Sequence, residues 1–119
     1  MKSLTMDQVK DIMSTAIESG IAYWMNEDCS NVEIKKSEGF GVSENIDDWV
    51  YLSVSFDWED AHYDVTLEEM LDKFDAFSIE FSNEEVYDGF VNRLLTDNYD
   101  AGDADVYFQF CAFGEVVYG

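Results

Sequence analysis

The sequence predicts an α+β domain in which three or four helices pack on a small antiparallel sheet of two or three strands. Three observations support this prediction: capping boxes that precede apolar stripes with helical spacing, a central stretch rich in β-branched and aromatic residues, and a nearly unbroken apolar segment close to the C-terminus. The 119 residues suffice for one small core, so we expect a single domain over residues 1–119.

The N-terminal part favours a helix followed by a strand. A helix is expected over residues 6–19, because a capping box precedes apolar residues with helical spacing. Gly20 either caps this helix or lies inside a longer one that continues through Trp24, and the sequence leaves both readings open. A short, half-buried strand is expected around residues 32–35, where apolar and charged residues alternate.

The centre of the chain favours a β-hairpin. Residues 49–56 have the composition of a strand, because aromatic and aliphatic residues prevail there. Residues 57–60 are polar and are expected to form the turn, after which residues 62–65 return as the antiparallel partner. The pattern does not determine the register of the two strands.

The C-terminal half favours helices. Capping boxes at residues 66–69 and 82–85 precede apolar stripes with helical spacing, which predicts two helices. The segment 104–113 is apolar almost throughout, so periodicity does not separate a strand from a buried helix. We favour a helix with Asp103 as its cap and Gly114 as its stop.

Charge is the strongest compositional signal. The chain has 27 acidic residues against 6 Lys and Arg, a net charge of −21. Solubility of a small domain needs a net charge of roughly 2 to 8 in magnitude. A surface this acidic repels nucleic acid and anionic membranes and attracts cations and basic proteins. Adaptation to high salt is a weaker explanation, because we expect such chains to reduce their aromatic content and this one contains 16% aromatic residues.

Cysteine and histidine patterns argue against the common metal sites. Cys29 and Cys111 lack a paired spacing, so we expect buried, reduced thiols, with a disulfide bond as the alternative. His62 is the single histidine, and pairing with a neighbouring carboxylate is favoured over a metal site. Residues 97–105 fail the EF-hand pattern, because Phe108 stands where the bidentate glutamate belongs. We therefore expect neither metal nor cofactor, with loose divalent binding at these two places as the alternative.

Catalytic and targeting signals give no positive indication. The sequence has no nucleophile elbow, zinc-protease, P-loop or dinucleotide-binding motif, so an enzyme is disfavoured. No apolar run has the length of a leader or a membrane span, which predicts a cytoplasmic protein.

Two sequence blocks resemble a known group of proteins. The segment 17–24 reads Ile-Glu-Ser-Gly-Ile-Ala-Tyr-Trp, and the C-terminal block comprises Ala104-Asp105-Val106, Gln109, Ala112 and residues 113–119. Both are similar to small uncharacterised proteins of bacteriophages and prophages. The resemblance implies a viral setting in a host cell and transfers no catalytic residue. By class analogy, phages use small acidic proteins against restriction enzymes and CRISPR effectors, whose nucleic-acid channels are basic.

The candidate partner-binding residues are carboxylates that the local structure alone does not favour. Like charges at positions i and i+4 destabilise a helix, and their spacing of about 5–6 Å is comparable to that of successive phosphates along a nucleic-acid strand. The candidates are Asp57, Glu59, Asp60, Asp64, Glu68, Asp72, Asp75, Glu84 and Asp88.

These observations favour a protein that mimics nucleic acid and blocks the basic DNA- or RNA-binding groove of a host defence protein, of the anti-CRISPR or anti-restriction type. The alternative is a phage structural or regulatory interaction module, with a homodimer as one of its forms, whose acidity only keeps it soluble. A divalent-dependent hydrolase is a third hypothesis.

Overall fold

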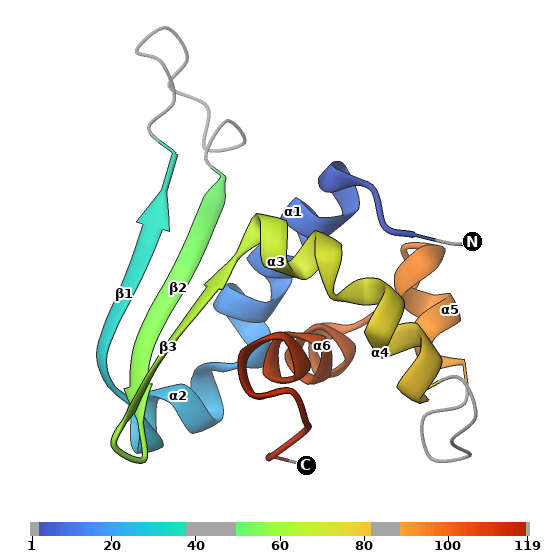
Figure 1. The fold of residues 1–119 in the computed structure, drawn as a ribbon. Helices are drawn as coiled ribbons and strands as arrows, with labels where there is room; N and C mark the ends of the chain where they lie inside the picture. Colours follow the sequence, from blue (N-terminus) through green and yellow to red (C-terminus); the bar gives the residue numbers. More distant parts are fainter. Residues whose placement is uncertain (1–2, 38–49, 82–88, 119) are drawn as a thin grey trace, which may run out of the picture.

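The computed structural model describes residues 3–37, 50–81 and 89–118, and within them the α+β prediction is confirmed (Figure 1). The sheet in this part of the chain is three-stranded and antiparallel, in the order β1 (Ser30–Lys36), β2 (Tyr51–Trp58) and β3 (Ala61–Thr66). The hairpin register pairs Val54 with Val65 and Asp57 with His62. Helices cover the sheet face that carries the buried residues Val54 and Val65.

The N-terminal helical stretch continues beyond Gly20, which resolves the alternative that the sequence left open. Helix α1 (Met6–Thr15) begins at the predicted capping box and passes into a π-helical turn, η1 (Ala16–Gly20), after which α2 (Ala22–Asp28) follows. Glycine is needed at position 20, because a Cβ there would come within 2.8 Å of the carbonyl oxygen of Ala101. The missing side chain lets η1 approach the C-terminal helix closely.

Strand β1 is exposed along its whole length, so the prediction of a half-buried strand was wrong. The reason is its position at the edge of the sheet, where only β2 pairs with it in the described residues. The predicted hairpin is confirmed, although its turn is narrower than expected: Asp57 and Trp58 still belong to β2, and the turn consists of Glu59 and Asp60 alone.

The helical stretch after β3 is divided at Lys73 into α3 (Leu67–Asp72) and α4 (Phe74–Phe81). The predicted capping box at residues 82–85 lies outside the described residues. Helix α5 (Phe90–Leu95) follows Gly89, whose φ of 77° favours glycine.

The apolar C-terminal segment is a helix, as predicted. Helix α6 (Ala101–Phe113) ends at Gly114, the predicted stop, which has a φ of 77°. The predicted cap was wrong by three residues: Asp100 is the N-cap, and Asp103 is the third helical residue of a reciprocal capping box. This shift occurs because the helix extends beyond the apolar run that marked it in the sequence.

The core contains two groups of aromatic side chains on opposite sides of α6. One group joins the sheet to α2 and the C-terminal segment and contains Trp24, Phe56, Trp58, Tyr63, Phe108, Phe113 and Tyr118. The other joins α4, α5 and α6 and contains Phe74, Phe77, Phe81, Phe90, Tyr107 and Phe110. These contacts fix the elements that carry the surface carboxylates.

A buried polar network connects α2 to α6 and to the C-terminal segment. Asp105 is only 4% exposed and accepts hydrogen bonds from Trp24 Nε1 (2.7 Å), the Tyr23 hydroxyl (2.9 Å) and Gln109 Nε2 (3.0 Å). Gln109 Oε1 accepts hydrogen bonds from the backbone N–H groups of Val117 and Tyr118. The segment 17–24 therefore contacts the C-terminal segment of the chain, and several polar residues of both have a structural role.

The thiols agree with the sequence prediction in one respect and differ in another. Cys29 and Cys111 are both free, as expected, but only Cys111 is buried. Burial raises the pKa of the Cys111 thiol to about 12.

Three tyrosines whose pKa is raised in the folded protein predict that the protein loses stability at alkaline pH. Burial and hydrogen bonds to carboxylates raise the pKa of Tyr23 to about 12 and raise that of Tyr99 further, and burial raises the pKa of Tyr107. In the unfolded chain these phenols ionise near pH 10, whereas the folded protein retains their protons, so the unfolded state binds fewer protons above that pH. The stabilisation is complete below about pH 10 and is lost as the pH rises through the folded values. The melting temperature should fall as the pH is raised above about 10, and a constant melting temperature up to about pH 12 would contradict the raised pKa values of these tyrosines.

Candidate functional site

The β2–β3 turn presents two of the predicted carboxylates at its tip. Glu59 and Asp60 are both exposed, with φ values of 48° and 66°. A two-residue turn of this form favours Asn or Gly, because positive φ costs other residues conformational energy. The chain therefore holds two acidic side chains where glycine would be less strained.

The outer face of the sheet carries a polar row across all three strands. Asn31 Nδ2 donates to Asp57 Oδ2 at 2.7 Å, and His62 Nδ1 lies 2.7 Å from Asp57 Oδ1. The Asn31 hydrogen bond and then His62 lower the pKa of Asp57. The prediction that His62 pairs with a carboxylate is confirmed, but its partner is the cross-strand residue Asp57 and not one of the acids nearest to it.

Asp64 lies on the same outer face of the sheet as Asp57. It is exposed and accepts a hydrogen bond from the Ser55 hydroxyl at 2.9 Å. An open concavity of about 500 Å³ lies beside the turn, and its lining includes Asp28, Asp57 and His62. Within the described residues, no three His, Cys, Asp or Glu side chains are placed to hold a metal ion together.

Helices α3 and α4 continue the acidic surface. Glu68 and Asp72 are exposed on α3, and Asp75 is exposed in the first turn of α4. The sequence predicted one helix for these three acids, but the break at Lys73 divides them between two helices. Asp75 is consequently stabilised by the N-terminal end of the α4 dipole, whereas Asp72 is at the unfavourable C-terminal end of α3.

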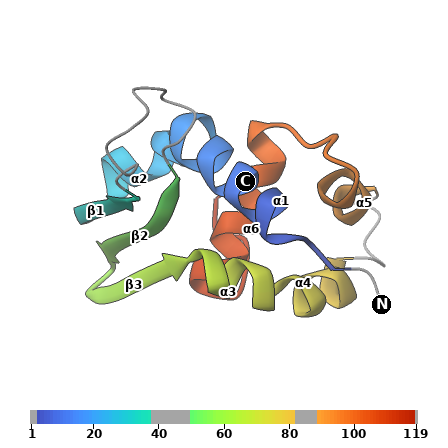
Figure 2. The same ribbon diagram turned by 90° about the horizontal axis from the view of Figure 1, so that it is seen from above.

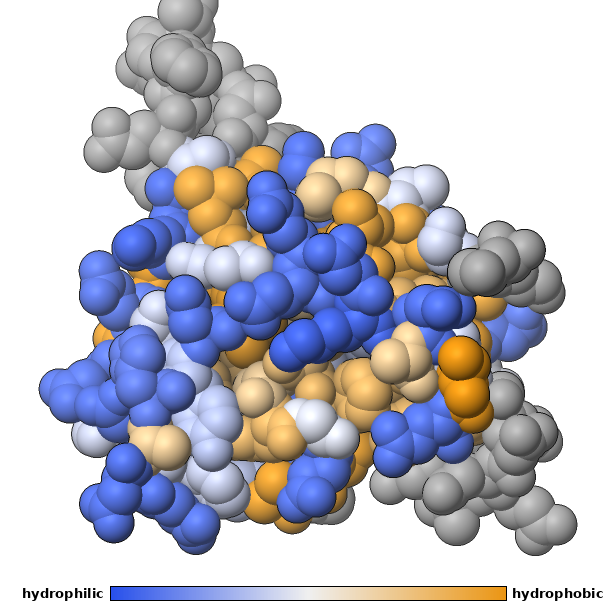
Figure 3. Space-filling view, viewed as in Figure 1, coloured by the Kyte–Doolittle hydropathy of each residue, from blue (hydrophilic) through white to orange (hydrophobic). Residues whose placement is uncertain are grey.

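The exposed and half-exposed carboxylates of the hairpin, α3 and α4 are together called the acidic ridge: Asp57, Glu59, Asp60, Asp64, Glu68, Asp72 and Asp75. Seen from above, β3, α3 and α4 run one after another along one side of the fold (Figure 2). The space-filling view shows hydrophilic surface over the hairpin and over α3 (Figure 3). The remaining two candidates, Glu84 and Asp88, lie outside the described residues.

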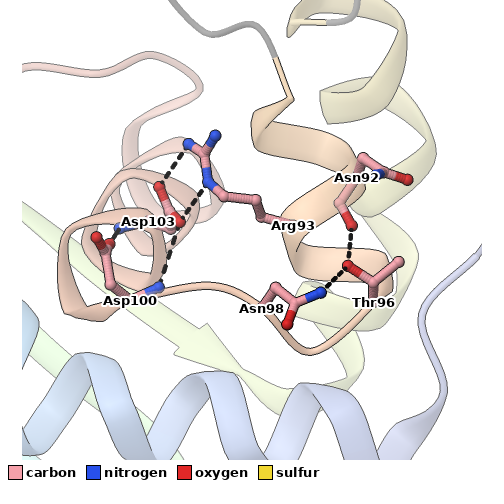
Figure 4. A network of polar contacts seen from close by, with 6 residues as sticks. All are labelled: Asn92, Arg93, Thr96, Asn98, Asp100 and Asp103. Atoms are coloured by element: carbon pink, nitrogen blue, oxygen red, sulfur yellow. Dashed lines mark hydrogen bonds and ion pairs between the residues drawn. The ribbon is translucent and has the colours of Figure 1, made fainter.

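Two cations near α4 and α6 have structural partners. Lys73 Nζ donates to the backbone carbonyl oxygen of Cys111 at 2.7 Å and lies 3.7 Å from Glu69 Oε2. Arg93 holds Asp103 through two hydrogen bonds of 2.8 and 2.9 Å, at the N-terminal end of α6 (Figure 4). Arg93 therefore fixes α5 to α6 instead of neutralising the acidic ridge.

Three of the acids within residues 97–105 have structural roles in α6. Asp100 and Asp103 form the capping box of α6, and Asp105 belongs to the buried network with Trp24. Sequence reasoning missed this role of Asp105, although a signal for it is present: Asp105 and Gln109 are polar residues at positions i and i+4 within an apolar helix.

No protein-family model, curated protein or solved structure matches the chain. The resemblance to phage proteins and the expected cytoplasmic location therefore stay predictions. Among the described residues, no helix has both the length and the apolar content that crossing a membrane requires.

Proposed function

We propose that the protein mimics nucleic acid and binds the basic groove of a host DNA- or RNA-binding protein, such as a CRISPR effector or a restriction enzyme. The observation that supports this proposal is the acidic ridge. Residues 57–81 contain nine carboxylates and one lysine. The lysine, Lys73, already contacts Glu69 and the Cys111 carbonyl group, so it offsets little of the surrounding negative charge.

The ridge has the physical properties that a nucleic-acid mimic needs. Its carboxylates are held on a sheet and two helices that are packed through Phe74, Phe77 and Val65, all without solvent exposure. Because these elements are already ordered, binding would cost less conformational entropy than binding by a flexible acidic tail. The negative field attracts a basic groove over distance, and salt screens this attraction.

The test neutralises two ridge residues. The double variant Asp72→Asn, Asp75→Asn should bind a purified CRISPR effector or restriction enzyme about tenfold more weakly than the original protein, because two charge contacts are lost. Affinity should also fall with added salt, and duplex DNA should compete for the same groove. Binding to a panel of such enzymes, measured by calorimetry with and without DNA, provides the readout.

The matched control is the double variant Glu27→Gln, Glu115→Gln, which removes the same charge from exposed positions outside the ridge. It should bind almost as well as the original protein. Equal losses in both variants would mean that net charge alone drives the association. Unchanged binding in both, with no effect of salt, would favour the alternative of an interaction module with solubilising acids.

A further inference from the structure

Strand β1 presents an edge that no other strand of the described residues covers. The strand order is β1-β2-β3, so only one side of β1 pairs, and Figure 1 shows the other side open. Val32 and Ile34 are 41% and 39% exposed. An edge with free backbone groups and exposed apolar side chains is a template for pairing with another strand. Its charges decide which strand fits.

The charged residues of β1 alternate in sign on the outer face. Glu33 lies opposite Ser55 and Lys35 lies opposite Ser53, so both point to the outer side of the sheet. Ile34 lies opposite Val54 and faces the inner side. Both charged residues are exposed, and within the described part of the chain no residue forms an ion pair with either of them.

We infer that β1 pairs with β1 of a second copy of this chain, in an antiparallel register centred on Ile34. In this register Glu33 of each copy lies opposite Lys35 of the other, so two ion pairs form on the outer face. The two Ile34 side chains meet on the inner face. The regularly paired part of the strand is Glu33 to Lys35, with a register irregularity on each side of it, and this part maps onto itself about Ile34.

The neighbouring symmetric registers are less favourable. When a two-fold axis perpendicular to the sheet relates the two copies of β1, residues opposite each other lie on the same face of the sheet. The axis therefore passes through the position of one residue of β1, and neighbouring symmetric registers move it by one residue along the strand. Centring on Glu33 places two glutamates opposite each other, and centring on Lys35 places two lysines opposite each other. Like charges directly opposite destabilise a strand pair. The charge pattern of β1 therefore favours the register centred on Ile34.

This inference does not depend on the proposed function. The pairing joins two sheets into one of six strands, with β3 at both outer edges, so it leaves the acidic ridge of each copy exposed. At a strand spacing of about 4.8 Å, the two β3 strands would lie about 24 Å apart. Because one strand pair buries little area, we expect a weak, reversible dimer.

Charge reversal tests the register. Sedimentation velocity over a range of protein concentrations, at about physiological salt so that the charge of −21 on each copy is screened, should show a dimer. Glu33→Lys should raise the dissociation constant about tenfold or more, because two lysines then face each other at each of the two positions. Lys35→Glu should raise the dissociation constant to a similar extent, because two glutamates then face each other at both positions. The combined variant Glu33→Lys, Lys35→Glu should restore the dimer.

Mixing supplies the sharpest result. The Glu33→Lys and Lys35→Glu proteins should each be monomeric but should form a mixed dimer when combined, because all opposed charges are then of opposite sign. The control is Glu27→Lys, which changes the net charge equally at an exposed site on α2 and should leave the dimer intact. A monomer at every concentration, or a dimer that ignores all these substitutions, would overturn the inference. Circular dichroism melts of each variant confirm that it is folded.

Discussion

Replacing Asp105 with alanine should lower the free energy of unfolding by about 3 kcal/mol. The carboxylate accepts hydrogen bonds from Trp24 Nε1 and Gln109 Nε2, and it is 4% exposed. Alanine would leave the buried Trp24 N–H without an acceptor, and the Gln109 amide would keep only its hydrogen bond to the Tyr118 carbonyl oxygen. Each buried donor hydrogen left without a partner costs about 1–3 kcal/mol. Removing a buried charge offsets part of this loss. Unfolding in urea, followed by tryptophan fluorescence, measures the difference.

Asp105→Asn is the matched variant and should cost much less. Trp24 and Gln109 both donate to the same oxygen, Oδ1, which an asparagine amide retains. The other oxygen accepts the Tyr23 hydroxyl, and an amide NH₂ group there can donate to the same hydroxyl instead. The asparagine variant should also lower the pKa of Tyr23, because the carboxylate contributes to the rise. If the alanine and asparagine variants both lower the free energy of unfolding only slightly, these hydrogen bonds do not stabilise the fold as expected.

Phe77→Ala should destabilise the fold by about 4 kcal/mol, a typical loss for the truncation of a buried aromatic side chain. Phe77 is fully buried, and its ring lies 4.6 to 5.6 Å from those of Phe81, Tyr107, Phe110 and Phe90. Removing it leaves a cavity among α4, α5 and α6, where these four rings and that of Phe74 lose a partner. Its effect should extend to α4, which carries Asp75 of the acidic ridge.

Phe77→Leu is the control, because leucine fills much of the space that alanine leaves empty. Its loss should be less than half that of alanine. Urea unfolding gives both free energies, and amide hydrogen exchange in α4 reports whether the ridge is loosened. Alanine and leucine variants of equal stability would mean that the neighbouring rings close the cavity.

The acidic ridge could be predicted as a set of residues but not as a surface. Counting acids in the sequence identified Asp57 to Asp75, and the structure describes all of them as exposed or half-exposed. The cross-strand partner of His62 could not be predicted, because it depends on a hairpin register that the residues between 49 and 65 leave undetermined. The expected helix containing Glu68, Asp72 and Asp75 breaks at Lys73, and nothing in the local spacing marks that break.

The residues of the buried network could also be predicted only in part from the sequence. The sequence marks Asp105 and Gln109 as polar residues in an apolar segment, but it does not reveal that their partners are Trp24, Tyr23 and the C-terminal backbone. These contacts join residues about eighty positions apart. Local propensity carries no information about such distances.

By itself, the sequence determined the fold class, the position of the hairpin, the helical form of residues 104–113 and the excess of negative charge. All of these depend on spacing, composition and capping within a few residues, where local interactions dominate. The tertiary structure alone decided that β1 is an exposed edge, that Gly20 lies against α6, and that β3, α3 and α4 align along one side. Those features arise from packing between distant segments, because burial and register are set by what each element meets and not by its own residues.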